Sequence, residues 1–197
     1  MQDTNPLLER ENTHRLKAIP FPLFKTEHFL PAIKESLEEA KAEIEAIKNN
    51  PEPPTFENTI LALDLAGEQL NYVSRIYFNL HSAESGPELK ALAQQISPLL
   101  SQFSSSISTD PKIFERVQAV YKAEVESKPK PAIPEDLKDK EALKAAERYR
   151  LIERNYKNFI RGGALLSDED KKRYTEISME LSKLSPQFSD HVLQAIN

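Results

Sequence analysis

The chain has 197 residues, of which 39% are hydrophobic and 29% are charged, and its formal net charge is -5. This composition is typical of a folded protein and excludes disorder of the whole chain. Lysine and arginine are scattered rather than clustered, so we expect no nucleic-acid partner. The apolar stretches are far shorter than the roughly 20 residues that cross a bilayer, so we expect no membrane span.

Cysteine is absent from the sequence, which excludes disulfides, thiolate catalysis and thiolate metal sites. The first residues lack the basic-then-apolar layout of a secretion signal. These features favour a cytoplasmic location. A periplasmic location is the alternative if a signal has been removed ahead of Met1.

Residues 1–25 predict an extended arm rather than a helix. Pro6, Pro20 and Pro22 interrupt any helical pattern, because proline lacks the backbone N–H and its ring clashes with the preceding turn. The arm also carries apolar side chains that need a surface to lie on. These are Ile19, Phe21, Leu23 and Phe24.

Residues 26–197 predict one all-α, bundle-like domain of about six amphipathic helices. Apolar residues recur at spacings of three and four, and no strand-like alternation is sustained. The expected helices cover 26–49, 55–82, a stretch from 87, a stretch from 111, 137–161, and a stretch that follows the acidic residues 167–170. Residues 127–136 contain three prolines and mixed charge, which predicts a surface linker.

Local signals mark several helix boundaries. Thr55 has the position of an N-cap, and Pro87 and Pro111 each occupy a first helical position. The pair Gly162-Gly163 predicts a left-handed stop after the fifth helix. Pro186 predicts a kink in the last helix.

The last helix carries a long apolar stripe. Its members are Tyr174, Ile177, Leu181, Leu184, Phe188 and Val192. The pattern is still in phase at Leu193 and Ile196, whereas the end of a natural chain usually frays into polar residues. We therefore expect a cut piece of a longer protein, with apolar surface left uncovered on the arm and the final turns. Weak self-association through that surface follows.

A search for catalytic chemistry finds no site. The histidines are His14, His28, His81 and His191, and none begins a His-Glu-x-x-His zinc motif. Glu11 precedes His14 by three residues, as in di-iron bundles, but the second such pair that a di-iron site needs is missing. There is no Gly-x-Ser-x-Gly elbow and no glycine-rich phosphate loop. The sequence predicts no catalytic, cofactor-binding or metal-ligating residue in this chain.

A family resemblance adds to this reading. Residues 50–60 read Asn-Pro-Glu-Pro-Pro-Thr-Phe-Glu-Asn-Thr-Ile, which resembles a stretch near the start of thimet-oligopeptidase-like zinc metallopeptidases. The run is most similar to the bacterial peptidyl-dipeptidases (dipeptidyl carboxypeptidases), with oligopeptidase A as the competing name. The likeness continues in order along the chain, at Pro31-Ala32, Leu61-Ala62-Leu63, Gly163-Ala164 and Leu181 to Leu193.

The resemblance implies that the chain is the N-terminal helical part of a longer enzyme, with the catalytic domain downstream of residue 197. In that family a His-Glu-x-x-His helix and a further glutamate hold zinc, which activates a water for peptide hydrolysis. The implied partners are that missing C-terminal catalytic half and short peptides held in a channel. The helices of this chain would form part of the channel wall.

Two other functions compete with this one. A stand-alone helical interaction module, such as an adaptor or inhibitor without enzymatic activity, is the main alternative. A small metal-dependent enzyme in its own right is contradicted by the missing ligand motifs.

Overall fold

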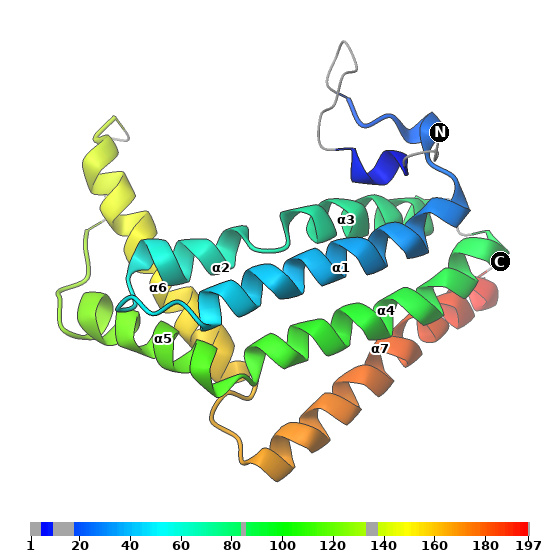
Figure 1. The fold of residues 1–197 in the computed structure, drawn as a ribbon. Helices are drawn as coiled ribbons and strands as arrows, with labels where there is room; N and C mark the ends of the chain where they lie inside the picture. The colour runs from blue at the N-terminus through cyan, green and yellow to red at the C-terminus, as the bar shows by residue number, and fades with distance from the viewer. Residues whose placement is uncertain (1–4, 10–17, 84–85, 133–137, 197) are drawn as a thin grey trace. The chain divides into compact units, whose positions relative to one another are not determined.

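The computed structural model describes residues 5–9, 18–83, 86–132 and 138–196. Helices make up all the regular structure in this part of the chain, and none of these residues lies in a strand (Figure 1). The all-α prediction is therefore confirmed. None of the helices in the same ranges is long and apolar enough to cross a membrane.

In the described part of the chain there are seven α-helices and four shorter helical turns. The α-helices are α1 (Thr26–Lys48), α2 (Ala62–Leu65), α3 (Glu68–Ala83), α4 (Pro87–Ser108), α5 (Pro111–Tyr121), α6 (Lys140–Arg161) and α7 (Asp168–Ile196). The shorter turns are the 3₁₀ turns η1 (Pro6–Leu8) and η2 (Phe21–Leu23) and the π-helical turns η3 (Phe56–Leu61) and η4 (Lys122–Glu126).

The chain divides into two compact units, each with its own buried residues. Unit 1 comprises Met1–Ala42, Gly67–Phe103 and Ile177–Asn197. Unit 2 comprises Glu43–Ala66 and Ser104–Glu176. Our prediction of a single domain over 26–197 with a separate arm stays a prediction.

The core of unit 1 is built by one face each of α1, α3 and α4. The buried side chains are Phe29, Ile33, Leu37 and Ala40 from α1, Leu70, Val73, Ile76 and Tyr77 from α3, and Ala93 and Ile96 from α4. Tyr77 stands edge-on to Phe29, with 5.5 Å between ring centroids, and its hydroxyl donates to the carbonyl of Leu89 at 2.6 Å. Burial raises the pKa of Tyr77 to about 12.

The described part of the arm is partly anchored on this core. Leu7 in η1 is fully buried, and its carbonyl accepts a hydrogen bond from Gln69 Nε2 at 2.8 Å. Ile19, Phe21 and Leu23 are exposed, as we expected for the arm. The expectation for Phe24 was wrong, because its ring packs against the core and is half-buried.

The helix expected over 55–82 is interrupted. It begins as the π turn η3, continues as α2 and breaks before α3 at Gly67, whose φ is +74°. That left-handed conformation suits glycine because it carries no Cβ. A Cβ at Gly67 would also lie 3.4 Å from the Cβ of Ala40. The apolar periodicity of the segment does not reveal this break.

The core of unit 2 gathers around α5 and α6. Ile113, Val117 and Val120 of α5 and Ile152 of α6 are fully buried or nearly so. The ring of Tyr156 stacks on Tyr121 at 3.9 Å and on Phe114 at 5.8 Å between centroids. Aromatic stacking of this kind adds to the apolar burial that holds the two helices together.

The ends of α6 follow local signals only in part. The helix begins at Lys140 rather than near residue 137, where Asp139 accepts from the backbone N–H of Ala142 at 3.0 Å. At its other end Gly163 is left-handed with φ +94°, as the glycine pair predicts. Gly162, with φ -78°, is not left-handed. The expected linker 127–136 lies partly outside the described residues.

Helix α7 differs from the others in where its apolar side chains lie. It starts after Ser167, whose hydroxyl accepts from the N–H of Asp170 at 3.1 Å, and it continues through Pro186. Its predicted stripe is exposed from Ile177 to Val192, with Leu181 at 56% and Phe188 at 69%, whereas Tyr174 is half-buried. The side chains of Leu193 and Ile196, which we expected to be uncovered, lie outside the described residues.

Candidate functional site

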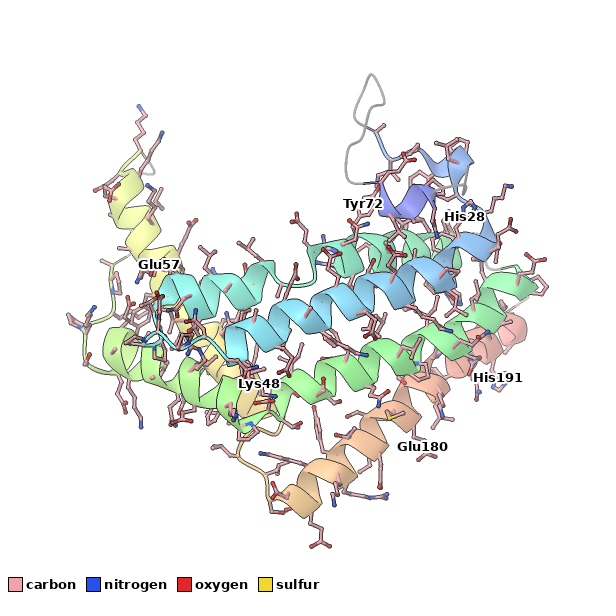
Figure 2. The ribbon with its side chains drawn as sticks, in the orientation of Figure 1. His28, Lys48, Glu57, Tyr72, Glu180 and His191 are labelled. Atoms are coloured by element: carbon pink, nitrogen blue, oxygen red, sulfur yellow. The ribbon has the colours of Figure 1, made fainter. Side chains whose placement is uncertain are left out.

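The histidines do not gather into a site in the described part of the chain. His28 lies in the first turn of α1, where its Nδ1 accepts from the backbone N–H of Lys25 at 3.1 Å. His81 is near the end of α3, and His191 is exposed on α7 (Figure 2). No group of three or more histidine, aspartate or glutamate residues could hold a metal ion within the same ranges. His14 and Glu11 lie outside them, so the absence of a metal site stays a prediction.

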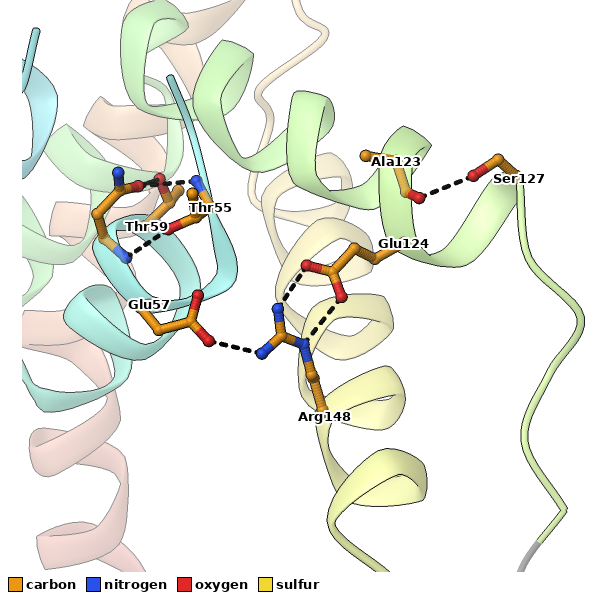
Figure 3. A network of polar contacts seen from close by, with 8 residues as sticks. Thr55, Glu57, Thr59, Ala123, Glu124, Ser127 and Arg148 are labelled. Atoms are coloured by element: carbon orange, nitrogen blue, oxygen red, sulfur yellow. Dashed lines mark hydrogen bonds and ion pairs between the residues drawn. The ribbon is translucent and has the colours of Figure 1, made fainter. Parts of the chain in front are cut away.

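The proline-rich run that carries the family resemblance has a structural role here. Thr55 and Asn58 form a capping box: the Thr55 hydroxyl accepts from the N–H of Asn58 at 3.1 Å, and Asn58 Oδ1 accepts from the N–H of Thr55 at 2.8 Å (Figure 3). Asn58 Nδ2 also donates to the carbonyl of Pro53 at 2.9 Å. The predicted cap at Thr55 is thus confirmed, and it fixes the start of η3.

A buried arginine holds the same run from α5. Arg116 is 8% exposed, and its Nη1 donates to the carbonyls of Asn50 at 2.8 Å and Glu52 at 3.3 Å. Its Nη2 donates to Asn58 Oδ1 at 3.2 Å. The carbonyls of Asn50 and Glu52 lie in the connection between α1 and η3, outside any helix. The Arg116 bonds give them the hydrogen-bond donors that a helix would otherwise supply. Nothing in the sequence singles out Arg116 from the other arginines.

A second arginine joins η3, η4 and α6. Arg148 makes two hydrogen bonds to the Glu124 carboxylate, from Nε at 2.8 Å and from Nη2 at 2.6 Å (Figure 3). Its Nη1 donates to Glu57 at 2.6 Å, and its guanidinium carbon lies 4.2 Å from the ring centroid of Phe56. The hydrogen bonds from Arg148 lower the pKa of both Glu124 and Glu57, and those carboxylates raise the pKa of Arg148.

Beside this network lies an open groove of about 630 Å³ in unit 2. It is lined by Phe56, Lys144, Glu147, Arg148, Arg150, Leu151 and Arg154. The guanidinium of Arg148 is already committed to two carboxylates, and Arg154 reaches Asp64 at 3.4 Å. Lys144 and Arg150 are exposed cations among its lining residues. Guanidinium and ammonium groups of this kind bind carboxylates. Because Lys144 pairs with Glu141 at 3.6 Å and Glu147 also lines the groove, the groove has the chemistry of only a weak anion-binding surface.

A second groove, of about 560 Å³ in unit 1, combines serine, histidine and aspartate. Its lining residues include His81, Asp190 and the serines 82, 97, 182, 185 and 189. A serine nucleophile needs a hydrogen bond to a histidine that an acid orients. Here the buried His81 Nε2 has no partner in the described part of the chain, and Asp190 pairs with Lys90 at 2.9 Å. The groove has none of the hydrogen bonds of such a triad.

Comparison with known proteins gives a consistent set of relatives, although no family model matches the chain. The chain is 32% identical to dipeptidyl carboxypeptidase of Escherichia coli strain K12 over 196 residues, which are 99% of this chain and 26% of that protein. It is 27% identical to oligopeptidase A of Salmonella typhimurium over 195 residues, 98% of this chain and 25% of that protein. Organellar oligopeptidase A of Arabidopsis thaliana is 27% identical over 176 residues.

The chain therefore spans about a quarter of the length of the curated relatives it matches. The match falls in the N-terminal part of those peptidases. This confirms the resemblance to thimet-oligopeptidase-like peptidases drawn from residues 50–60. Both competing types, the dipeptidyl carboxypeptidases and oligopeptidase A, are among the relatives.

Proposed function

We propose that this chain is the non-catalytic N-terminal helical domain of a zinc peptidyl-dipeptidase that hydrolyses short peptides. The observation that carries the proposal is a match along 99% of the chain to only 26% of a dipeptidyl carboxypeptidase. A likeness that covers the whole of this chain in order is more specific than any one motif. We expect the enzyme to be cytoplasmic, with the periplasm as the alternative.

The zinc and its ligands belong to the part of the proposed enzyme that this chain does not contain. No His-Glu-x-x-His occurs anywhere in the 197 residues. The serine-lined groove of unit 1 lacks the hydrogen bonds of a nucleophilic triad, as described above. Both observations support a structural rather than a catalytic role for these helices.

The experiment that tests this function uses the full reading frame of the gene. Its purified product should hold one zinc and release dipeptides from a short unstructured peptide, and a chelator should abolish that release. The 197-residue chain alone should do neither. A reading frame that stops after Asn197, or a full-length product without peptidase activity, would support the stand-alone interaction module instead.

We further propose that the helices form part of a peptide channel wall, to which the groove of unit 2 contributes. The exposed cations Lys144 and Arg150 can attract the C-terminal carboxylate of an incoming peptide. In the full-length product, Arg150→Glu should then raise KM for short peptides about threefold with little change in kcat. Lys172→Glu, a matched charge reversal at an exposed site on α7, should leave KM unchanged. An unchanged KM for Arg150→Glu would remove the groove from the channel without affecting the peptidase assignment.

A further inference from the structure

The apolar face of the part of α7 that lies in unit 1 is exposed to solvent. We call this face the α7 stripe; its members are Ile177, Leu181, Leu184, Phe188 and Val192. Their exposed fractions are 43%, 56%, 49%, 69% and 41%. Spacings of four, three, four and four residues place all five on one side of the helix. A contiguous apolar face of this length is unusual on a protein surface and marks an interface.

The opposite face of α7 is mostly polar apart from the half-buried Met179 and Pro186, and its Ser182, Pro186 and Asp190 lie on unit 1. Ser182, Pro186 and Asp190 follow at intervals of four, and all three line the serine-rich groove with residues of α3 and α4. Lys90 of α4 pairs with Asp190 at 2.9 Å, and Gln187 Nε2 donates to Gln94 Oε1 at 3.2 Å. Amphipathic helices normally bury their apolar side and expose their polar side. In α7 this order is reversed, so the stripe has its partner elsewhere.

We propose that the α7 stripe is the docking surface for the C-terminal three quarters of the peptidase, the part that this chain does not contain. This inference rests on the proposed function. The relatives are about four times longer than the matched region, and the match falls in their N-terminal part. In a protein of that length, about three quarters of the polypeptide lies outside this chain and is available to cover the stripe.

The pattern of the stripe indicates what kind of surface covers it. Apolar residues spaced three and four apart are typical of a seam between two helices. Exposed polar residues flank the seam, among them Glu180 and His191, which Figure 2 labels on α7. An apolar strip with a polar rim is the usual anatomy of a protein interface. The fitting partner is an amphipathic helix of the catalytic part.

A second copy of the chain is a less favourable partner for the α7 stripe than a segment of the same polypeptide. Five side chains that are about half exposed offer roughly 500 Å² of apolar surface, below the roughly 800 Å² that each partner of a stable complex buries. A segment of the same polypeptide needs less area, because the covalent connection supplies a high effective concentration. The size of the stripe therefore favours an intramolecular partner.

The absence of cysteine allows a direct test of accessibility. Single substitutions Leu184→Cys and Phe188→Cys place a thiol on the stripe. Lys183→Cys, also at an exposed position, places one well away from the stripe around the helix. Alkylation is followed by mass spectrometry of the labelled peptide, in the 197-residue chain and in the product of the full reading frame. Circular dichroism checks that each variant keeps its helix content.

In the isolated chain all three thiols should react at similar rates. In the full-length product the thiols at positions 184 and 188 should react at least about tenfold more slowly, and the thiol at 183 within about twofold of its rate in the chain. Equal rates at all three positions in a full-length product that releases dipeptides would overturn the docking surface and leave the proposed function standing.

Two other outcomes would also overturn the inference. Protection of positions 184 and 188 in the isolated chain, increasing with protein concentration, would assign the stripe to a second copy. A full-length product without peptidase activity would remove the proposed function and with it the partner named here. Peptidase activity and thiol protection are measured separately, so the two failures are distinguishable.

Discussion

In α1 the apolar residues Phe29, Ile33 and Leu37 are at most 5% exposed, whereas in α7 Leu181 and Phe188 are 56% and 69% exposed. Both helices repeat apolar residues at spacings of three and four, and both carry charged residues between them. The same apolar periodicity is therefore found on a buried face of α1 and on an exposed face of α7. Periodicity identifies which residues share a face, and the neighbouring elements decide whether that face is covered.

The faces opposite the two stripes account for part of the difference. Between its apolar residues α1 carries long charged side chains, such as the ion pair of Glu38 and Lys41 at 2.7 Å, which stay in solvent. On α7 the opposite face includes Ser182, and the small Ser182, Ser185 and Ser189 line a groove with other elements of unit 1. Small polar residues permit close packing of a helix face that long charged residues would keep in water.

The largest expected effect comes from replacing a leucine of the buried face of α1 and comparing it with a leucine of the exposed α7 stripe. Leu37→Ala should lower the free energy of unfolding by about 3 kcal/mol, because it leaves a cavity in a packed core. Leu181→Ala should cost less than about 1 kcal/mol, since its side chain is largely in solvent. Urea denaturation followed by circular dichroism measures both. Equal costs would mean that the α7 stripe is buried in the isolated chain, and the contrast between the helices would fail.

A smaller effect is expected at the glycine that lies against α1. Gly67→Ala should destabilise the chain by about 1 kcal/mol, because φ at this position is +74° and an L side chain is strained there. Thermal unfolding detects a change of this size. Gly67→Asn should cost less than Gly67→Ala, since asparagine tolerates the left-handed region better. If alanine and asparagine cost the same, contact with Ala40 rather than backbone strain limits this position.

Removal of a helix cap should lower the free energy of unfolding by the same amount whether or not the apolar face of that helix is buried. Thr55 caps η3 and Ser167 caps α7, each through a hydroxyl that accepts a backbone N–H at 3.1 Å. Replacement of either by alanine should cost about 1 kcal/mol in urea denaturation, and the exchanges Thr55→Ser and Ser167→Thr should restore most of it. A negligible cost at Ser167 beside a full cost at Thr55 would show that α7 frays independently of the rest of the chain.

The smallest predicted effect concerns the C-terminal end of α1 and depends on pH. Lys48 pairs with Asp110 at 2.8 Å. Burial raises the pKa of Asp110, but the hydrogen bonds from Lys48 and from the N–H groups of Ile113 and Lys112 outweigh burial, and the pKa lies below its ordinary value of 3.8. A lowered carboxyl pKa stabilises the fold above the ordinary value, and that stability is lost as pH falls through the lowered value.

Asp110→Asn keeps an acceptor for the helix cap and removes the charge. Between pH 5 and pH 2 this variant should lose less of its free energy of unfolding than the wild type, by up to about 1 kcal/mol. Lys48→Met should reduce the pH dependence of stability over the same range. Urea midpoints measured across that range test this. Unchanged acid sensitivity in both variants would show that the pair contributes nothing to stability.

The sequence alone determined several local features of this protein. The cap at Thr55, the first-position proline of α5 and the left-handed Gly163 all follow from hydrogen bonds or backbone sterics within a few residues. The resemblance at residues 50–60 was also a property of the sequence, and comparison with known peptidases confirmed it. These features need no knowledge of distant parts of the chain.

The candidate groove shows where sequence reasoning stops. Arg148 reaches Glu57 and Glu124, which are 91 and 24 residues away in the sequence, and Arg116 reaches Asn50 across 66 residues. No local pattern distinguishes these arginines from Arg150, which lies exposed two positions from Arg148. A long-range ion pair depends on which helix faces meet, and that is decided when the chain packs.

The tertiary structure likewise decided the fate of the apolar faces. The periodicity of α7 fixed which side chains share its stripe, because side-chain direction follows the helix turn by turn. Whether the stripe was covered depended on which face of α7 met α3 and α4, and there the polar contacts of Asp190 and Gln187 placed the stripe in solvent. The apolar periodicity of residues 55–82 likewise did not reveal the break at Gly67, whose left-handed φ of +74° glycine adopts without a Cβ clash.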